Sequence, residues 1–455
     1  MKLLILSTRI IATVVFLLLT LHAVGQETQE KEKKNQFSID LNLLGRGEMR
    51  YGGFTEGDAD NSAQFLMERT RLILNYKRPH LEMKVSAQHS GIWGQKGKGS
   101  FNLYEAWAKL STNNGFFAQV GRQALSYDDE RIIGPNDWAM AASSHDVIKL
   151  GYEGAGHKVH AIIGFNQNAE NITGGTYYKD GAQPYKSMQT LWYHYDIPNT
   201  PLSASLLFMN IGMQAGDTAR VKAINNPDKT EYQQLIGGYV SYRTKRWLIE
   251  GSYYHQLGRT VVTIDPKNDR ELRGMKLNAW MANISAQYKI TSQVGVMAGF
   301  DYLSGDDYFV LRKAPIGLVE HKEIKYFNPV YGSNHKFYGM MDFFYVQAFT
   351  DSFSPGLQNL YAGVTYNPIQ KLKLKAVYHY LAMATTLEDI NKTLGHDIDI
   401  EASYQILKDA RVSIGFSYMT SSKTMELLGR AEKDKNLKWA WLSLSFTPRI
   451  FSTKW

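Results

Sequence analysis

Basic side chains recur at every second position in two stretches of this chain. Arg69 and Arg71 form a pair, and Lys371, Lys373 and Lys375 form a row. In an extended strand, residues i, i+2 and i+4 line one face, so each set would present adjacent positive charges on one side of the backbone. Facing water, such charges favour anions. Alternatively, they pair with acidic residues of the same faces and only keep those faces wet.

The same parity places further charged residues on polar faces. The basic candidates are Arg46, Arg50, Lys84, Lys109, Lys149, Lys158, Arg243, Lys289 and Arg411. The acidic candidates are Asp40, Glu48, Glu82, Glu105, Glu250, Asp301, Asp397, Asp399 and Glu401. Basic groups lead by a small margin, which favours anions over cations as partners of these faces.

Segment 121–134 alternates charge with glycine and aromatic residues, which predicts a folded loop. Asp128, Asp129 and Glu130 could offer carboxylate oxygens to Ca²⁺, but a run of three acids lacks the spaced ligands of a defined calcium loop. Ion pairing to Arg122 and Arg131 is the favoured interpretation. The sequence therefore predicts no metal and no cofactor.

A second segment, 305–356, is too long for an ordinary connection and too aromatic for disorder. Its part 327–339 contains Asn334, His335, Lys336 and Tyr338, which we expect to form a gating loop that folds into or over the interior. The aromatic rings could stack on sugars or pack the loop against a wall.

Catalysis has little support in the sequence. His89, His145, His335 and Ser90 supply reactive atoms, but no motif places a nucleophile beside a base. We therefore expect no enzymatic activity, with a surface enzyme as the less favoured alternative.

The elements that position these residues are strands of about ten residues with one apolar and one polar face. Ile398, Ile400 and Ala402 alternate with Asp399 and Glu401, for example. The strands of soluble β-sandwiches alternate in the same way, so the lengths of the connections between strands must distinguish a sandwich from a membrane barrel. Tight turns are expected at 76–80, 112–115, 153–156, 197–201, 243–246, 289–292, 366–370 and 406–410. Long polar loops are expected at 54–64, 91–100, 125–145, 167–186, 213–230, 258–271, 305–356, 383–394 and 421–435.

Short turns at one end and long loops at the other are typical of a transmembrane antiparallel β-barrel of the outer-membrane type. The connections predict about 18 strands in an all-β fold. Residues 1–25 form a signal peptide, since Lys2 and Arg9 precede a short apolar run and small residues. Residues 26–35 then form a short periplasmic lead-in, and 36–455 form a single barrel domain.

Composition agrees with this class. Aromatic residues make up 13% of the chain, as interfacial girdles require, and there is no cysteine, which excludes disulfides and thiol chemistry. The formal net charge is +8, without a basic cluster that would indicate a nucleic-acid partner. The expected partners are the lipid bilayer of a Gram-negative outer membrane and a small solute.

Three blocks of the sequence resemble the alginate-export family of outer-membrane porins. They are 103–110 (LYEAWAKL), 120–152, and 334–339 (NHKFYG) with Asp342. The resemblance implies a monomeric barrel of eighteen strands that passes an anionic polysaccharide through a constriction rich in arginine and lysine, gated by a loop and a periplasmic turn. It places Arg122 and Arg131 in that constriction, with Asp128 orienting them.

Together these observations predict a channel for passive diffusion of anionic solutes, of the acidic oligo- or polysaccharide kind. The alternatives are a general porin without preference, an enzyme barrel, and a barrel that its long loop plugs permanently.

Overall fold

The computed structural model describes residues 35–52, 62–166, 185–214, 216–217, 230–264, 271–306, 323–342, 344, 354–428, 430–431 and 435–455. The predicted signal peptide 1–25 and nearly all of the predicted lead-in lie outside these residues.

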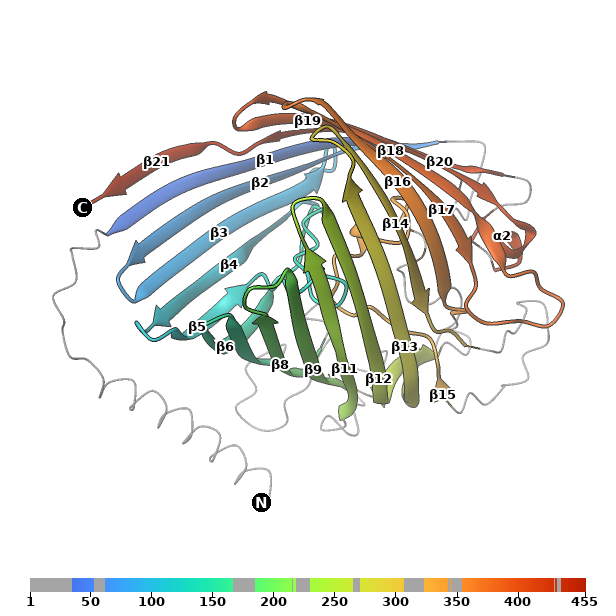
Figure 1. The fold of residues 1–455 in the computed structure, drawn as a ribbon, viewed down its shortest axis with the longest axis horizontal. Coiled ribbons are helices and arrows are strands. Elements are labelled where there is room, and N and C mark those ends of the chain that lie inside the picture. The colour runs from blue at the N-terminus through green and yellow to red at the C-terminus, as the bar shows by residue number, and fades with distance from the viewer. Residues whose placement is uncertain are drawn as a thin grey trace, which may run out of the picture.

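One β-sheet contains almost all of the regular structure (Figure 1). Its first half consists of β1 (Gln36–Tyr51), β2 (Ala63–Arg78), β3 (Leu81–Ile92), β4 (Ser100–Ser111), β5 (Phe116–Gln123), β6 (His145–Gly154), β7 (His157–Phe165), β8 (Ser187–Asp196) and β9 (Leu202–Gln214). Its second half consists of β11 (Thr230–Arg243), β12 (Trp247–Ile264), β13 (Glu271–Lys289), β14 (Val294–Leu303), β16 (Leu357–Ile369), β17 (Leu372–Ala382), β18 (Thr393–Leu407), β19 (Ala410–Ser421), β20 (Leu437–Phe446) and β21 (Arg449–Lys454). The smaller elements are β10 (Gly216–Asp217), β15 (Glu323–Ile324), a 3₁₀ turn (Asn334–Lys336) and α2 (Lys423–Leu427).

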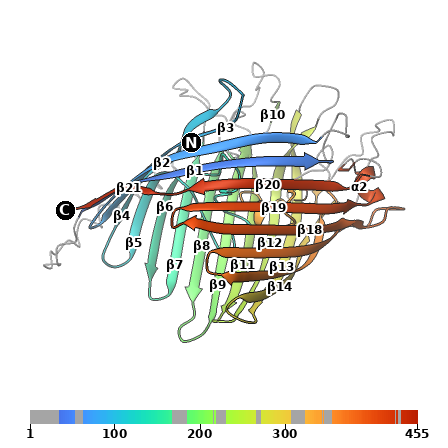
Figure 2. The same ribbon diagram turned by 90° about the horizontal axis from the view of Figure 1, so that it is seen from above.

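The sheet closes on itself because β1 pairs with strands from both ends of the chain. It is antiparallel to β2 on one side, and to β20 and β21 on the other. β20 lines the second half of β1 and β21 the first half, so the two act as one strand interrupted at Pro448 (Figure 2). The result is a closed antiparallel barrel of 18 strands, which confirms the predicted fold.

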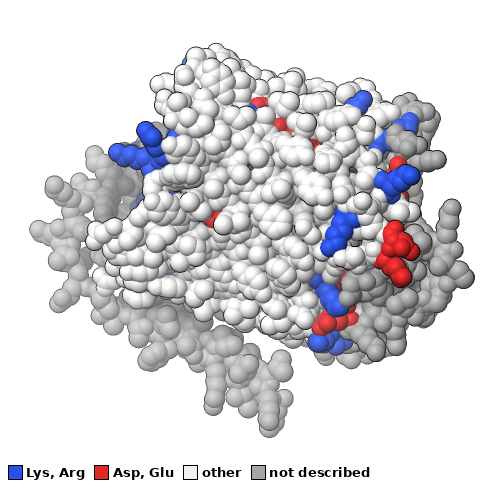
Figure 3. All heavy atoms as spheres, turned by 45° about the vertical axis from the view of Figure 1, so that its right-hand side comes forward, with Lys and Arg blue, Asp and Glu red and all other residues white. Residues whose placement is uncertain are grey.

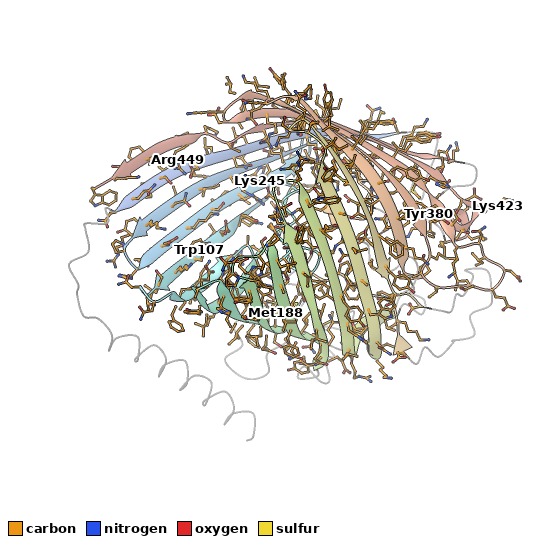
Figure 4. The ribbon with its side chains drawn as sticks, in the orientation of Figure 1. Trp107, Met188, Lys245, Tyr380, Lys423 and Arg449 are labelled. Carbon is orange, nitrogen blue, oxygen red and sulfur yellow. The ribbon has the colours of Figure 1, made fainter. Side chains whose placement is uncertain are left out.

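The two faces of the wall differ as the alternation predicts. On β18, Ile398 and Ile400 are 46% and 49% exposed, whereas Asp397 and Asp399 are 1% and 3% exposed. The same contrast holds around the barrel, with side chains projecting from both faces of the strands (Figure 4). The face of the barrel seen in Figure 3 is accordingly mostly uncharged, and most of its charged side chains lie toward the margins. Such an apolar band suits contact with lipid chains.

All eight predicted tight turns join consecutive strands at one end of the barrel. The predicted loop 258–271 is wrong in extent, because β12 runs to Ile264 and β13 begins at Glu271. Pairing between β12 and β13 continues to Ile264 and Glu271, so the hydrogen bonds between these two strands override the polar composition of the segment. In the described part of the chain, no helix is long and apolar enough to cross a bilayer.

Candidate functional site

Two segments, 124–144 and 325–342, connect strands and pack against each other and against inward side chains of the wall. Ile133 and Tyr331 form a parallel bridge. In it, the N–H of Tyr331 donates to the carbonyl of Ile132 at 3.1 Å, and the N–H of Gly134 donates to the carbonyl of Tyr331 at 2.9 Å. The N–H of Ser333 donates to the carbonyl of Glu130 at 2.9 Å. The two segments thus form one body, which we call the inserted body.

Arginines of β1 and β2 hold the first segment. Nη1 of Arg69 donates to the carbonyl of Asp137 at 2.9 Å, and Nη1 of Arg46 donates to that of Trp138 at 3.0 Å. The Asp137 carboxylate lies 2.7 Å from Nη1 of Arg71 and 3.2 Å from Nη2 of Arg69. Arg69 and Arg71 do face the interior, as predicted, but both are at least 95% buried beneath the segment. Their charges position the inserted body.

Arg131 ties both segments to the opposite wall. Its guanidinium lies 2.9 Å from Asp129 and 2.8 Å from Asp301 on β14, and it stacks on the ring of Phe337 with 3.9 Å to the ring centroid. Nη1 also donates to the hydroxyl of Tyr338 at 3.3 Å. Burial opposes the charge of Arg131, but the two carboxylates outweigh it and raise its pKa. Arg131 is therefore inside the barrel, as predicted, but as a buried anchor.

Asp128 does not orient Arg122 or Arg131, so this expectation is wrong. Its carboxylate accepts a hydrogen bond from the indole of Trp192 on β8 at 3.1 Å and from the hydroxyl of Tyr254 on β12 at 3.5 Å. Burial raises the pKa of Asp128. The neighbouring Asp129 is the partner of Arg131 instead, because the left-handed backbone at Asp128, with φ of 54°, turns successive side chains in different directions.

Arg122 lies on the outer side of the wall. It shares the strand face of Val120, which is 51% exposed, whereas Gln119 and Gln123 on the other face are buried. Its guanidinium donates two hydrogen bonds of 2.8 Å to Asp146 on β6. The predicted place of Arg122 in a constriction is therefore wrong, because alternation along β5 turns its side chain away from the lumen.

The predicted gating residues lie in the inserted body. His335 stacks on Trp138 with 3.9 Å between ring centroids, and its Nδ1 is 2.8 Å from Asp342. Lys336 pairs with Glu130, and Tyr338 is buried. Asn334 begins the 3₁₀ turn, and its side chain lies outside the described structure. These contacts fold the segment against the first one.

The second segment also contacts the wall on β18. The N–H of Met340 donates to the carboxylate of Asp399 at 2.8 Å, and Asp399 also accepts a hydrogen bond from Ser417. Between the inserted body and the wall from β12 to β18 lies a cavity of about 520 Å³. Its charged wall residues are Glu250, Asp301, Lys375, Asp399 and Glu401. The cavity thus has a polar, charged lining.

Two of the three residues of the predicted lysine row face the interior. Lys373 and Lys375 share the β17 face of Val377 and His379, which are buried, while Tyr378 on the other face is exposed. Lys371 lies in the turn before β17. Among the described residues, none of these three lysines has a carboxylate within ion-pair distance, although Glu401 lies opposite Lys375 in the strand register and Asp399 is near it. Their ammonium groups are therefore not held by ion pairs of the described structure.

Lys109 and Lys149, which the sequence predicts only as members of the polar faces, lie close together in the interior. Lys109 on β4 and Lys149 on β6 both face Phe117, with Nζ atoms 4.2 and 5.8 Å from its ring centroid. Gln119 lies opposite both lysines in the strand register. No carboxylate of the described residues lies within ion-pair distance of either ammonium group.

Sequence reasoning missed Asp137 and Trp138. Neither lies in a strand, so no alternation could assign them to a face, and their partners are more than 60 residues away. Within the described residues, no group of three acidic or histidine side chains has an arrangement suited to a metal ion.

The comparisons with known proteins agree with this architecture. The family model described as "Alginate export" matches residues 88–426. Among solved structures, OpdQ of Pseudomonas aeruginosa shares 15% identity at a TM-score of 0.56, covering 92% of this chain and 98% of its own. OccAB1 of Acinetobacter baumannii shares 11% at 0.60, covering 94% and 100%, and a BenF-like porin of Pseudomonas fluorescens shares 12% at 0.57, covering 91% and 99%. No curated protein matches the chain in sequence.

The family match covers well over half of the chain, and the structural likeness supports the fold alone. Barrel closure, the apolar outer band and the family together locate the protein in the outer membrane of a Gram-negative bacterium. The chain belongs to the alginate export family and is an outer-membrane barrel of the porin type.

Proposed function

We propose that the protein is a non-enzymatic channel for passive diffusion of anionic solutes, of the acidic oligo- or polysaccharide kind. The observation that carries this proposal is the set of lysines without an ion-pair partner among the described residues, in the half of the lumen near the short turns. They are Lys109, Lys149, Lys373 and Lys375, with Lys371 in the adjoining turn. Adjacent like charges that form no ion pair repel each other, so an anion that enters between them is stabilised.

The row on β17 supplies a path along the wall. Alternate residues of a strand lie about 7 Å apart, so an anion can pass from one ammonium group to the next without losing contact with positive charge. The pair at Phe117 adds an aromatic ring between two cations, although that ring is buried. Lysine is a point charge with a flexible stem, so it holds a carboxylate more loosely than arginine does. Loose binding at several sites is what conduction needs.

The carboxylates of the cavity favour a second candidate, a general porin without charge preference. Glu250, Asp399 and Glu401 line the cavity beside Lys375. Their negative charge would offset part of the lysine field and weaken the retention of a polyanion. The two candidates therefore differ in the sign and size of ion selectivity.

The contacts of the histidine and serine candidates named from the sequence support a role without catalysis. His89 pairs with Glu68, Ser90 contacts Ser100, and His335 is held by Asp342. A nucleophilic serine needs a base within hydrogen-bond reach, and these contacts do not join Ser90 to a histidine. Ser205 does lie 2.8 Å from Nδ1 of His194, whose Nε2 lies 3.0 Å from Asp196, so serine replacement at this position is the control for the absence of catalysis. Since one chain closes the whole barrel, we also propose that a monomer conducts.

Reversal potentials of the purified protein in planar bilayers test the proposal. In a salt gradient, we expect wild type to prefer anions and to be blocked saturably by oligouronates but not by neutral oligosaccharides of equal length. The variants K371Q/K373Q/K375Q and K109Q/K149Q should each lose a large part of both effects.

The matched control is K438Q, since Lys438 projects from the outer face of β20. It should leave selectivity unchanged. A wild-type channel with no anion preference and no block would contradict the proposal and leave the general porin.

A further inference from the structure

Arg69 and Arg71 hold a carboxylate that belongs to the chain itself. Asp137 lies with Oδ1 2.7 Å from Nη1 of Arg71 and with Oδ2 3.2 Å from Nη2 of Arg69. A carboxylate spread across two guanidinium groups is the arrangement in which arginines recognise a free carboxylate ligand. The side chain of Asp137 is 51% exposed although both arginines beneath it are buried. It therefore covers the arginines from the open side.

The two arginines have hydrogen-bond donors that Asp137 does not use. Nε of Arg69 and Nη2 of Arg71 are buried and donate no hydrogen bond. Buried donors of this kind are costly and usually find a partner. Arg71 also lies over the ring of Tyr104, with 3.8 Å to the ring centroid, and Nε of Arg71 donates to Gln88. Neither contact supplies a second negative charge.

Positive charge exceeds negative charge around the site. Glu48 on β1 pairs with both Arg46 and Arg50, at 2.9 Å from each. The four guanidinium groups of Arg46, Arg50, Arg69 and Arg71 thus have two carboxylates within ion-pair distance, those of Glu48 and of Asp137 in the inserted body, and Asp342 is a third negative charge near Arg46. An additional or replacement anion would find both charge and hydrogen-bond donors there.

We propose that Arg69 and Arg71 form a carboxylate-binding site that Asp137 occupies in this structure, and that a carboxylate-bearing solute competes with Asp137 for it. This inference rests on the proposed function, since it names a binding site for the same class of solute. Asp137 is then a built-in competitor that keeps the site from being filled at low solute concentration.

Displacement of Asp137 need not release the whole segment. The carbonyls of Trp138 and Ala141 keep their hydrogen bonds to Arg46 and Gln88 when the carboxylate leaves. A tethered group competes at an effective concentration of about millimolar or more, so a solute must bring several carboxylates to displace it well. Oligouronates should therefore compete better than acetate.

The test compares block of single-channel current by trigalacturonate in wild type, D137N and D146N. Asp137→Asn keeps the shape of the side chain and removes the competing charge, so half-block should occur at about tenfold lower concentration, a gain of about 1.4 kcal/mol. Asp146→Asn removes the same charge from the outer face, where Asp146 pairs with Arg122, and should leave block unchanged.

A loosened segment could also change block, so the double variant R71Q/D137N separates the two explanations. If Arg71 binds the carboxylate of the solute, replacing Arg71 abolishes the tighter block by trigalacturonate expected in D137N. A gain that persists without Arg71, or half-block in D137N that equals wild type or needs more trigalacturonate, would overturn the inference.

The outcome is separable from that of the proposed function. The proposed function is judged on the reversal potential of wild type, whereas this inference is judged on the difference in block between D137N and wild type. A weakly selective wild-type channel that gains block in D137N would contradict the first and support the second.

Discussion

Two basic regions of the lumen use their charges in opposite ways. Arg46, Arg69 and Arg71 contact carbonyls and the carboxylate of the inserted body, and are buried by it. Lys373 and Lys375 make no ion pair with the described residues and remain exposed. The physical reason is the number and geometry of donors: a planar guanidinium can bind a carbonyl and a carboxylate at once, and an ammonium on a flexible stem cannot fix a loop as well.

The inward-facing basic residues of this barrel therefore have two different roles. The arginines decide where the inserted body lies and hence how much of the lumen it fills. In the proposed function, the lysines are the groups that act on a passing anion. Each region therefore makes a different quantity sensitive to mutation: stability, conductance and, through displacement of Asp137, block by carboxylates for the arginines, and ion selectivity for the lysines.

The largest effect should come from Arg131, the most deeply buried of the anchoring cations. Arg131→Met leaves Asp301, which is 1% exposed, without its counter-charge. Breaking one side of a buried ion pair costs about 3–5 kcal/mol, and we expect that loss in the free energy of unfolding measured by urea titration in detergent micelles.

Two controls sharpen the contrast with Arg131. The double variant R122Q/D146N removes an exposed pair on the outer face and should change stability by less than about 1 kcal/mol. K371Q/K373Q/K375Q should leave stability near wild type while changing selectivity. If the lysine variant lost as much stability as Arg131→Met, the distinction between anchoring arginines and lysines without ion pairs would be wrong.

A smaller effect, on conductance, should follow from removing the second segment of the inserted body. Replacing 327–339 with a short Gly-Ser linker eliminates Phe337 and Tyr338, which pack on Arg131 and line the cavity. We expect single-channel conductance above that of wild type, since less of the lumen is filled. Unchanged conductance in a correctly folded barrel would show that the segment does not obstruct the route.

The smallest effect should come from Asp128, whose pKa is raised by burial above the ordinary value of 3.8. The folded state therefore binds its proton more tightly than the unfolded state does. The stabilising contribution is present below the ordinary value and is lost as pH rises through the folded pKa. Asp128→Asn should flatten this part of the pH dependence of unfolding.

Unfolding midpoints measured from pH 4 to 8 check that sign. Asn keeps an oxygen that can accept from Trp192, so the variant should be at least as stable as wild type at neutral pH. A variant that is less stable than wild type across the whole range would show that the ionised carboxylate is stabilising.

Strand faces were predictable where alternation is long and regular. Ile398 and Ile400 are outside, and Asp397 and Asp399 are inside, as their spacing indicates. For Arg122 the family resemblance and the strand parity disagree, and the structure follows the parity. Val120, two residues earlier, is apolar and shares its face, so the local pattern already indicated an outward side chain.

The inserted body could not be predicted to the same detail. Three consecutive acids, Asp128, Asp129 and Glu130, look alike in sequence, but Asp128 and Glu130 have left-handed backbone with φ of 54° and 71°. The three carboxylates therefore point to different partners: Trp192, Arg131 and Lys336. No periodicity governs such a segment, because its dihedral angles vary from residue to residue.

The sequence by itself determined the barrel, because strand alternation and turn composition are local properties that repeat along the chain. Only the tertiary structure decided which charged side chains form ion pairs within the described structure and which do not. Asp137 meets Arg71 across 66 positions of sequence, and Arg131 meets Tyr338 across 207. Such pairs exist only once the wall has closed, because closure brings inward side chains from distant strands around the same inserted segments.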